Sequence, residues 1–326
     1  MNTANSIRKN NWPTTMRLRS IIVQYAPFIV LVLLIAWNCT YTKNFAHLST
    51  LWNAMFQCAP VMVISMGMML VIASGGIDIS VGSMMAGAGT LAAFVMSKTS
   101  IQAGVLCGIA FGIIGGILNG VLVGKFRIQP MIVTLSTMYI FRGIAKLITN
   151  GTIIGTKQPD FNSLSYIKLW VKSPIQMYVF IVIIIIIAII ERKTRFGTYV
   201  QACGDNKNAA YFAGISTAGV LIITYTLCGL LSSFAGLMEI ALSTGADPYN
   251  LGLNNELDAI AAVAIGGTPM SGGKPRVAGT IAGVFILRIA TIMVNMNNVA
   301  YAYSLTIKAG ILILAILLQR VKINEA

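Results

Sequence analysis

The sequence predicts an all-α polytopic membrane protein, folded as a single transmembrane domain over residues 1–326. Hydrophobic residues make up 56% of the chain and charged residues only 10%, whereas a soluble domain carries about 25% charged residues. Apolar blocks near the ~20 residues that a helix needs to cross a bilayer recur along the whole chain. The lysines and arginines gather in alternate connecting segments, which is typical of multi-pass proteins.

In chain order, the apolar blocks predict about ten transmembrane helices. The eighth is too short to cross as a simple helix, so we expect it to be broken or partly re-entrant, with its irregular backbone covered by protein. The expected limits are 20–40, 52–74, 79–97, 102–124, 129–149, 175–190, 217–242, 256–267, 277–295 and 301–318.

An arrangement with both termini inside explains the net charge of +14. Most basic residues then fall in inside segments, which include the cytoplasmic tail 1–19 and the loop 191–216. The outside loops hold only Lys43, Lys98, Lys157, Lys168 and Lys172. This is the positive-inside bias of membrane proteins, so the charge needs no nucleic-acid partner, and the expected surroundings are the lipid bilayer.

The segment Ser74–Ser83, SGGIDISVGS, lies within a long apolar block, and Asp78 is the single carboxylate in it. We expect Gly75 and Gly76 to end one helix and Asp78 to start the next. An Asp in a first turn interacts favourably with the helix dipole and can cap free N–H groups, but an ionisable residue in a membrane protein also marks a transport pathway. Both interpretations stay open. The segment shares the pattern GGxxxSxG with Gly266–Gly273.

The fourth expected span carries a glycine at every fourth position. This spacing puts bare backbone along one helix face, and small residues let helices pack closely where lipid gives no hydrophobic driving force. We therefore expect a helix-packing role for Gly104, Gly108, Gly112, Gly116, Gly120 and Gly124.

Two connecting segments are longer than the others, 150–174 outside and 191–216 inside. In the second, Asp205 and Asn206 are expected to cap a short helix from Lys207 to about Ala213, which Gly214 ends. From the residues alone, such a helix is either an element that docks a partner or a connector that lies on the membrane.

The sequence holds no pattern for catalysis or metal binding. His47 is the only histidine, and the five cysteines are scattered without metal-ligand spacing. The segment Gly267–Pro275, GTPMSGGKP, fails the phosphate-loop pattern because an extra glycine precedes Lys274 and no hydroxyl follows it. We therefore expect no bound ATP, cofactor or metal, and no enzyme activity in this chain.

Four stretches of the sequence are distinctive in combination: VIASGGIDISVGS at 71–83, ACGDNKNAAYFAGI at 202–215, YTLCGLLSSFAGLMEIA at 225–241 and ELDAIAAVAIGGTPMSGGKPRVAGT at 256–280. Together they resemble the permease subunits of bacterial ABC importers for simple sugars, the ribose, xylose, galactose and galactofuranose class. The similarity covers nearly the whole chain, in order and with matching spacing, and its details lean toward galactofuranose-type permeases.

The resemblance implies a vitamin B12-importer-like permease fold with broken helices, in the bacterial inner membrane. Two permeases pair, as a homodimer or a heterodimer. A cytoplasmic ABC ATPase, which binds ATP and Mg, docks below, and a periplasmic sugar-binding protein delivers a monosaccharide from above. In the family, the loop between spans six and seven carries the ATPase-coupling helix, which maps here to Gly204, Asp205, Asn206, Ala209, Ala210, Gly214 and Ile215.

A neutral sugar requires a path lined by hydroxyl, amide and aromatic groups. The candidate lining residues are Asp78, Ser80, Ser83, Asn119, Thr134 and Ser136. Two alternatives stay open: a permease for a nucleoside or other small solute in the same class, and a stand-alone ion-coupled secondary carrier with an ion site among Asp78, Glu239 and Asp258. The sequence leaves open which partners neutralise Glu239, Arg288 and Lys308, which lie in expected spans.

Overall fold

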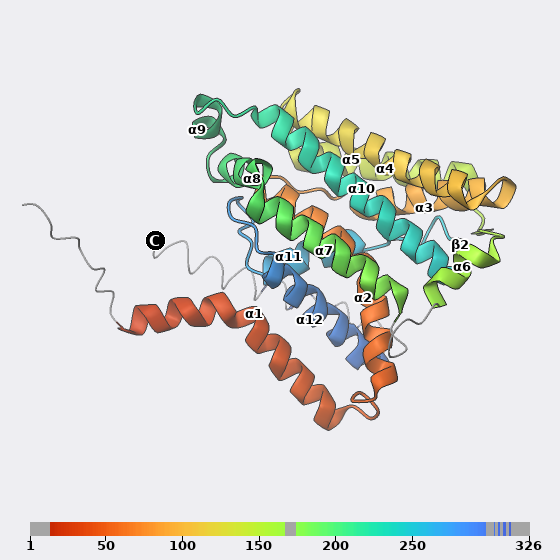
Figure 1. Cartoon of the computed structure of the whole chain (residues 1–326), viewed down its shortest axis with the longest axis horizontal. Coiled ribbons are helices and arrows are strands. Elements are labelled where there is room, and N and C mark those ends of the chain that lie inside the picture. The colour runs from red at the N-terminus through yellow and green to blue at the C-terminus, as the bar shows by residue number, and fades with distance from the viewer. Residues whose placement is uncertain are drawn as a thin grey trace, which may run out of the picture.

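The computed structural model describes residues 14–166 and 174–297, together with Tyr303, Thr306, Ala309, Gly310 and Ile313. The described residues form twelve helices and two short strands (Figure 1). The first half of the chain forms α1 (Thr14–Tyr41), α2 (Leu48–Ala73), α3 (Val81–Lys98), α4 (Ile101–Gly124), α5 (Pro130–Thr149), β1 (Ile154–Gly155) and α6 (Pro159–Tyr166). The second half forms α7 (Ile175–Lys193), α8 (Arg195–Asp205), α9 (Lys207–Phe212), α10 (Thr217–Ser243), β2 (Gly245–Ala246), α11 (Asn255–Ile265) and α12 (Val277–Met296).

The first nine expected spans coincide closely with α1–α5, α7 and α10–α12. Among the described residues, six helices are long and apolar enough to cross a membrane: α2, α4, α5, α7, α10 and α12. The prediction of a helical, multi-pass membrane protein is therefore confirmed. The tenth expected span, 301–318, lies almost wholly outside the described residues.

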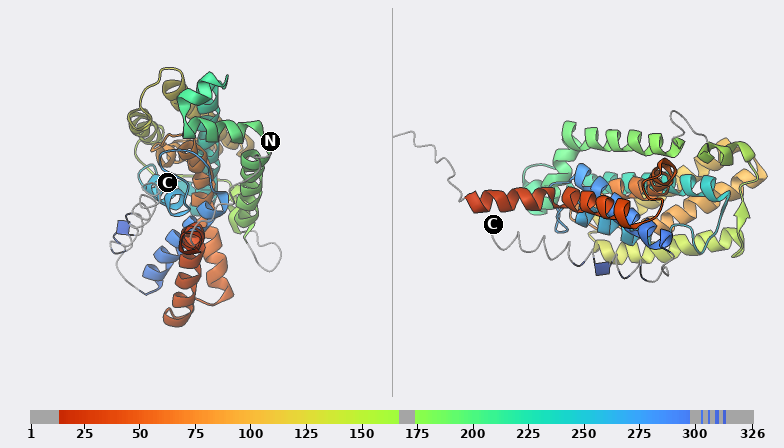
Figure 2. Two further views of the ribbon diagram at one scale, coloured as in Figure 1. Left: turned by 90° about the vertical axis from the view of Figure 1, so that its left-hand side faces the viewer. Right: turned by 90° about the horizontal axis from the view of Figure 1, so that it is seen from below.

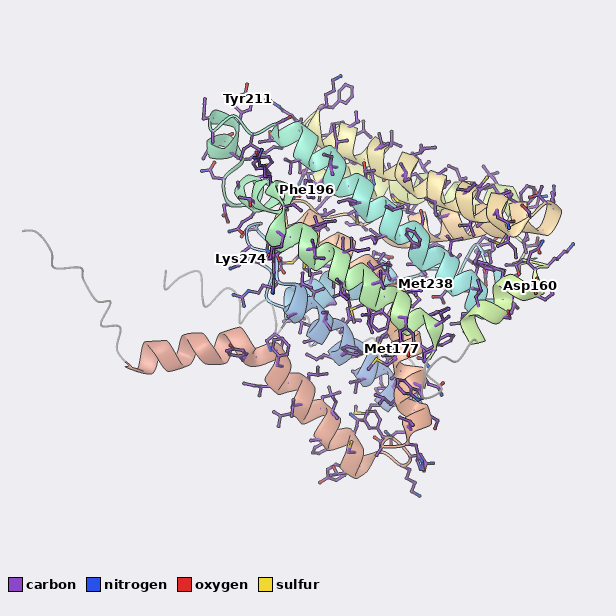
Figure 3. All side chains as sticks on the ribbon, viewed as in Figure 1. Asp160, Met177, Phe196, Tyr211, Met238 and Lys274 are labelled. Carbon is purple, nitrogen blue, oxygen red and sulfur yellow. The ribbon has the colours of Figure 1, made fainter. Side chains whose placement is uncertain are left out.

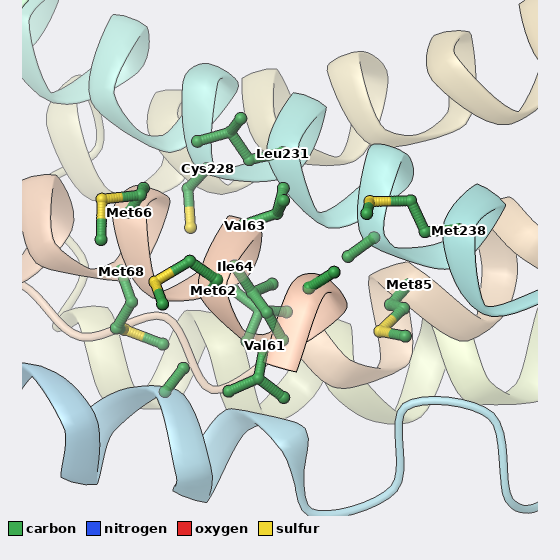
Figure 4. Close-up of a cluster of buried hydrophobic side chains, with 14 of the residues drawn as sticks. Val61, Met62, Val63, Ile64, Met66, Met68, Met85, Cys228, Leu231 and Met238 are labelled. Carbon is green, nitrogen blue, oxygen red and sulfur yellow. The ribbon is translucent and has the colours of Figure 1, made fainter. Parts of the chain in front are cut away.

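Helix α2 is the centre of the fold. Every residue from Cys58 to Ala73 is buried, as expected for a helix that is apolar on all sides. Figure 4 shows its Met62, Ile64 and Met66 between α10, which contributes Cys228, Leu231 and Met238, and α12 on the opposite side. Methionine suits this position because its unbranched side chain fills irregular gaps between helices.

The glycines of α4 lie against neighbouring backbone. Gly112, Gly116, Gly120 and Gly124 face α10, and Gly104 and Gly108 face α3. An ideal Cβ at Gly120 would lie 2.7 Å from the Ile222 Cα, and one at Gly124 would lie 2.8 Å from the Ala218 carbonyl oxygen. The four-residue glycine spacing thus provides close packing within the chain.

The short helix α11 is one half of a broken segment. It is preceded by the irregular stretch 247–254, in which Leu251 and Gly252 are buried. Gly252 packs against the Gly82 carbonyl group at the start of α3, and Leu251 packs against Gly89. These two residues are covered by protein, whereas Tyr249, Asn250 and Leu253 of the same stretch are exposed. After α11, the loop 266–276 leads into α12, and Gly283 of α12 lies directly on Ala262 of α11.

The two ends of the bundle differ. At one end lie α8 and α9, and at the other lie α6 and the strands, which pair antiparallel with Ile154 opposite Ala246 (Figure 1). Sequence reasoning expected the segments 150–174 and 191–216 to be loops and did not anticipate α6 or α8. Helix α1 lies at the edge of the bundle and bends along its length, and its Pro27 removes one helical hydrogen bond (Figures 1 and 2).

Candidate functional site

A buried polar cluster lies at the break between α2 and α3. The Oδ1 atom of Asp78 accepts hydrogen bonds from the Ser80 backbone N–H at 3.0 Å and from the Ser80 hydroxyl at 2.6 Å. The Nδ2 group of Asn119, on α4, donates to the same hydroxyl oxygen at 2.8 Å. All three side chains are fully buried. The cluster ties the break in the chain to α4.

The start of α3 differs from the sequence prediction. Helix α2 ends at Ala73, and Gly75 has a φ of +85°, which glycine adopts without strain. Helix α3 begins at Val81, three residues after Asp78, and its N-cap residue, Ser80, makes no side-chain capping bond. Asp78 therefore does not start the helix; it stabilises the turn that leads into it.

Tyr225 of α10 faces the same cluster, and sequence reasoning missed it. An ideal Cβ at Gly76 would lie 2.5 Å from the Tyr225 hydroxyl oxygen, so only glycine fits beneath this ring. The ring is close enough to Asp78 for an electrostatic interaction. A tyrosine in a span was not a distinctive signal, because its role depends on which helix it faces.

The candidate path residues do not all meet. Thr134 of α5 is buried, and its hydroxyl donates to the Ile77 carbonyl at 3.4 Å and to the Pro130 carbonyl at 2.9 Å, so it adjoins the cluster. Ser83 is buried one turn into α3, outside the hydrogen bonds described above. Ser136 is exposed on α5 and bonds to the Ile132 carbonyl of its own helix. Asp78, Ser80, Asn119 and Thr134 are buried, whereas Gly75, three residues before Asp78, is exposed.

Helix α9 forms where the sequence predicts it. The Asn206 side chain accepts hydrogen bonds from the backbone N–H groups of Asn208 and Ala209, both at 3.0 Å. Gly214, with a φ of +83°, ends the turn. The preceding helix, α8, begins at a Thr194 cap, whose side chain accepts from the Gly197 N–H.

The two faces of α9 have different surroundings. Ala210 is buried in a small apolar cluster with Ala73, Val200, Cys203 and Val220, so this alanine faces the chain itself rather than a partner. Ala209 and Gly214 are exposed. Burial raises the pKa of the Cys203 thiol, more than Lys207 lowers it. Cys203 therefore acts as a small apolar side chain of this cluster.

A junction of glycines connects α8 to both GGxxxSxG segments. Gly204, at the end of α8, lies against the Ala73 carbonyl group at the end of α2 and against the backbone of Gly272 and Gly273. The Gly273 N–H donates to the Ala73 carbonyl oxygen at 2.9 Å. A side chain at Gly204 would collide with this backbone. The loop 191–216 is thus in direct contact with both breaks in the helical bundle.

Helix α5 holds the irregular stretch 247–254. The Nη1 group of Arg142 donates to the carbonyl oxygens of Leu251 at 2.7 Å and Pro248 at 3.3 Å. The Nζ atom of Lys146, one turn later, lies 4.3 Å from the centre of the Tyr249 ring. Both bases lie within the expected span 129–149, and the sequence gave no sign of a partner for Arg142, because the carbonyl groups that it binds lie more than a hundred residues away.

One intramembrane charge has an opposite charge in its surroundings. Arg288 of α12 interacts electrostatically with Glu239 of α10, although no direct ion pair between them forms in the described part of the chain. Opposite charges reduce the cost of placing each in the membrane. Lys308 lies outside the described residues.

Comparison with known proteins shows the family. Residues 50–316 match the family described as "Branched-chain amino acid transport system / permease component". The chain is 34% identical over 305 residues to the Ribose import permease protein RbsC of Escherichia coli (strain K12), covering 92% of this chain and 95% of the relative. It is also 34% identical over 267 residues to the Galactofuranose transporter permease protein YtfT of the same strain, covering 81% and 77%.

A third relative, the L-arabinose transport system permease protein AraH of the same strain, is 32% identical over 300 residues, covering 92% of this chain and 91% of the relative. No solved structure matches the chain. The family match, residues 50–316, includes both breaks in the helical bundle, the glycine-rich α4 and the loop that carries α8 and α9. The chain therefore belongs to the family of permease components of transport systems.

Proposed function

We propose that this chain is the permease subunit of an ATP-driven importer that carries a monosaccharide across the bacterial inner membrane. The observation that supports this most is the near full-length similarity to permeases named for ribose, galactofuranose and L-arabinose. The substrate we propose is a ribose-like sugar or galactofuranose. The chain itself is a transport component, and a separate ABC ATPase hydrolyses ATP with Mg.

The proposed arrangement has both termini in the cytoplasm, about ten spans and a vitamin B12-importer-like fold. The broken segment formed by 247–254 and α11 supports the proposal of broken helices. Two copies of the chain, or this chain and a related permease, enclose the path. A periplasmic binding protein delivers the sugar at the α6 end, and the ATPase docks at the end with α8 and α9.

The glycine junction suggests how ATP drives transport. When the ATPase subunits close on ATP, they move α9. Because Gly204 lies directly on the end of α2 and on Gly272 and Gly273, movement of α8 reaches both broken segments at once. A tightly packed protein interior deforms little, so a helix that moves displaces the backbone that it contacts. The breaks then act as hinges, and the path opens toward one side at a time.

The Asp78 cluster acts in this scheme as the anchor of the first hinge. Its side chains are buried inside one subunit rather than arranged along an opening, and the Ser80 bonds fix the turn before α3. Of the candidate path residues, Ser136 of α5 is exposed, which supports the proposal that it meets a substrate between two subunits.

The test is sugar uptake by membrane vesicles that contain permease, ATPase and binding protein. We expect uptake of a pentose or hexose that requires ATP and stops when the ATPase carries an inactive phosphate loop. Uptake that persists with the inactive ATPase, or uptake by the purified permease alone along an ion gradient, would instead support a secondary carrier. If the cognate binding protein binds nucleosides but no sugars, the proposed substrate is wrong and a nucleoside takes its place.

A further inference from the structure

The segment 247–258 consists of the irregular stretch 247–254 and the first turn of α11, and it lies between the two ends of the bundle. It begins directly after β2, at the end marked by Asp160, and the chain continues through α11 toward Lys274 at the opposite end (Figure 3). Between these ends, Leu251 packs against Gly89 in the middle of α3. The segment therefore runs beside the helices of the bundle rather than beyond their ends.

Helix α5 indicates the depth of this segment in the membrane. Arg142 donates to the carbonyl oxygens of Pro248 and Leu251. It lies seven residues before Thr149, the last residue of α5, and α5 is long and apolar enough to cross a membrane. At 1.5 Å per residue, seven residues correspond to about 10 Å along the helix axis. The two carbonyl groups are therefore bound at a level inside the span.

Part of the segment is exposed at this depth, although its backbone is not helical there. Tyr249 is 52% exposed and Leu253 is 54% exposed, and Asn250 between them is exposed as well. Leu257, in the first turn of α11, is also exposed. Lipid cannot form hydrogen bonds with free N–H and C=O groups, so irregular backbone at membrane depth occurs only where protein covers it or where it lines a water-filled cavity.

Charged side chains accompany the exposed backbone. Arg142 interacts electrostatically with Asp247 and Glu256, and all three residues are partly exposed. In contrast, the stretch Met177–Ile190 of α7 holds no charged residue, and its exposed side chains, such as Val182, are apolar. This stretch has the composition of a lipid-facing helix, whereas charges that are only partly buried at membrane depth need water around them.

The composition of the surface suits a small neutral solute. Sites for such solutes are mostly apolar and aromatic, with a few polar groups that orient the ligand. Two bases accompany three acids, so the surface has little net charge with which to select an anion or a cation. The charged residues are Arg142, Lys146, Asp247, Glu256 and Asp258.

We propose that the exposed side of the segment 247–258 lines the water-filled path of this permease. Tyr249 lies nearer the α6 end of the path, and Leu253 and Leu257 continue its wall toward the opposite end. A neutral sugar forms hydrogen bonds with the polar groups of this wall and places its C–H groups against the aromatic and apolar side chains. The inference rests on the proposed function, and it assigns the path to residues that the sequence did not single out.

The experiment measures the reaction of single cysteines with a charged, water-soluble thiol reagent, present on both sides of vesicles that contain permease, ATPase and binding protein. The background carries Cys39→Ser and Cys107→Ser, because the other three cysteines are buried. In this background, Leu253→Cys is compared with Val182→Cys of α7, a matched control because both native side chains are 54% exposed.

Leu253→Cys should react at least about tenfold faster than Val182→Cys, because a thiol reacts as the thiolate, which forms in water and not in lipid. A saturating sugar should slow this reaction; the sugar is D-ribose, L-arabinose or D-galactose, whichever supports the highest uptake. Equally slow reaction of both cysteines places Leu253 against lipid or a second copy of the chain and overturns the proposal. Fast reaction that the sugar does not slow also overturns it, because water then reaches a surface outside the path.

A second pair of variants tests the path by its width. Leu253→Trp should lower ATP-dependent uptake at least about fivefold by narrowing the path, and Val182→Trp should leave uptake unchanged, with thermal unfolding as the check on the fold of each. Equal uptake by the two variants contradicts the proposal. If the background takes up no sugar at all, the proposed function fails, whereas the reaction rates without sugar still decide whether water reaches the segment.

Discussion

The two breaks in the bundle share the sequence pattern GGxxxSxG but are held by different forces. The first, residues 74–80, is fixed by side chains: Asp78 binds Ser80, and Asn119 joins them. The second, residues 266–276, is fixed mainly by backbone, with positive φ at Gly267, Gly272 and Gly273 and close contact with α8. Its one side-chain bond within the loop runs from the Arg276 N–H to the Thr268 hydroxyl oxygen at 3.0 Å.

The difference shows that one residue pattern can be held in place in two ways. We call the two connections between helices joints: the first joint is residues 74–80 and the second joint is residues 266–276. A buried hydrogen-bonded cluster holds a turn in one conformation, because any movement that breaks some of its hydrogen bonds leaves buried polar groups without partners, at a cost in free energy. The glycine contact of the second break depends on close packing and on one backbone hydrogen bond, from the Gly273 N–H to the Ala73 carbonyl oxygen, so its backbone can separate without leaving a buried charge. We infer that the first break is the stiffer joint and that the second yields first when α8 moves.

Gly204→Val should have the largest effect because it disturbs both joints together. The new side chain would overlap the Ala73 carbonyl group and the backbone of Gly273. Overpacking at a site without room costs about 3 kcal/mol. We expect a marked fall in the thermal unfolding temperature in detergent and loss of ATP-dependent uptake. Wild-type stability and uptake in this variant would contradict the junction as described.

Asp78→Ala should destabilise the first joint alone. It removes the acceptor of two Ser80 hydrogen bonds, which for buried groups costs about 1–3 kcal/mol. Asp78→Asn is the matched control, because an amide oxygen still accepts both bonds. We expect the thermal unfolding temperature to fall clearly for alanine and little for asparagine. If asparagine lowers uptake in a normally stable complex, Asp78 contributes its charge to transport and is more than an anchor.

Thr268→Val tests the second joint in the same way. It keeps the shape of the side chain and removes the single hydroxyl acceptor, at a cost of about 1 kcal/mol. We expect a smaller fall in unfolding temperature than for Asp78→Ala. A larger fall would show that the second joint depends on side-chain bonds as much as the first.

Lys274→Gln should have the smallest effect. Lys274 is exposed in the second break and makes no contact on which the joint depends. Exposed substitutions away from such contacts change stability by less than about 0.5 kcal/mol. Thermal unfolding and uptake should both match the wild type, and a clear loss of uptake alone would place Lys274 at the ATPase surface.

Much of the fold could be predicted because its signals are local. The apolar blocks predicted the positions of the helices. A segment in lipid must form hydrogen bonds between its own backbone N–H and C=O groups, and a helix does so. Asn206 and Gly214 located α9 through capping. Helix α8 was missed because its apolar residues, such as Val200 and Cys203, are few and face a small cluster formed by distant segments.

The candidate site was harder to predict than the helices. Asp78, Ser80 and Asn119 were singled out as polar residues in apolar surroundings, but the sequence could not show that they bond to one another, because Asn119 is 39 residues from Ser80. Tyr225 and Arg142 meet partners from other helices, and Leu253 resembled an ordinary apolar residue until its exposure was known.

The chain could be recognised from its residues as a multi-pass helical membrane protein, together with the positions of most of its helices and the family that it resembles. These properties follow from hydrophobicity, capping and motif spacing along the chain. The folded arrangement was needed to show that Ala210 is buried while Phe212 is exposed, and that Gly204 contacts both breaks. The physical reason is that a helix has several faces, and the packing of remote segments determines which of them is covered.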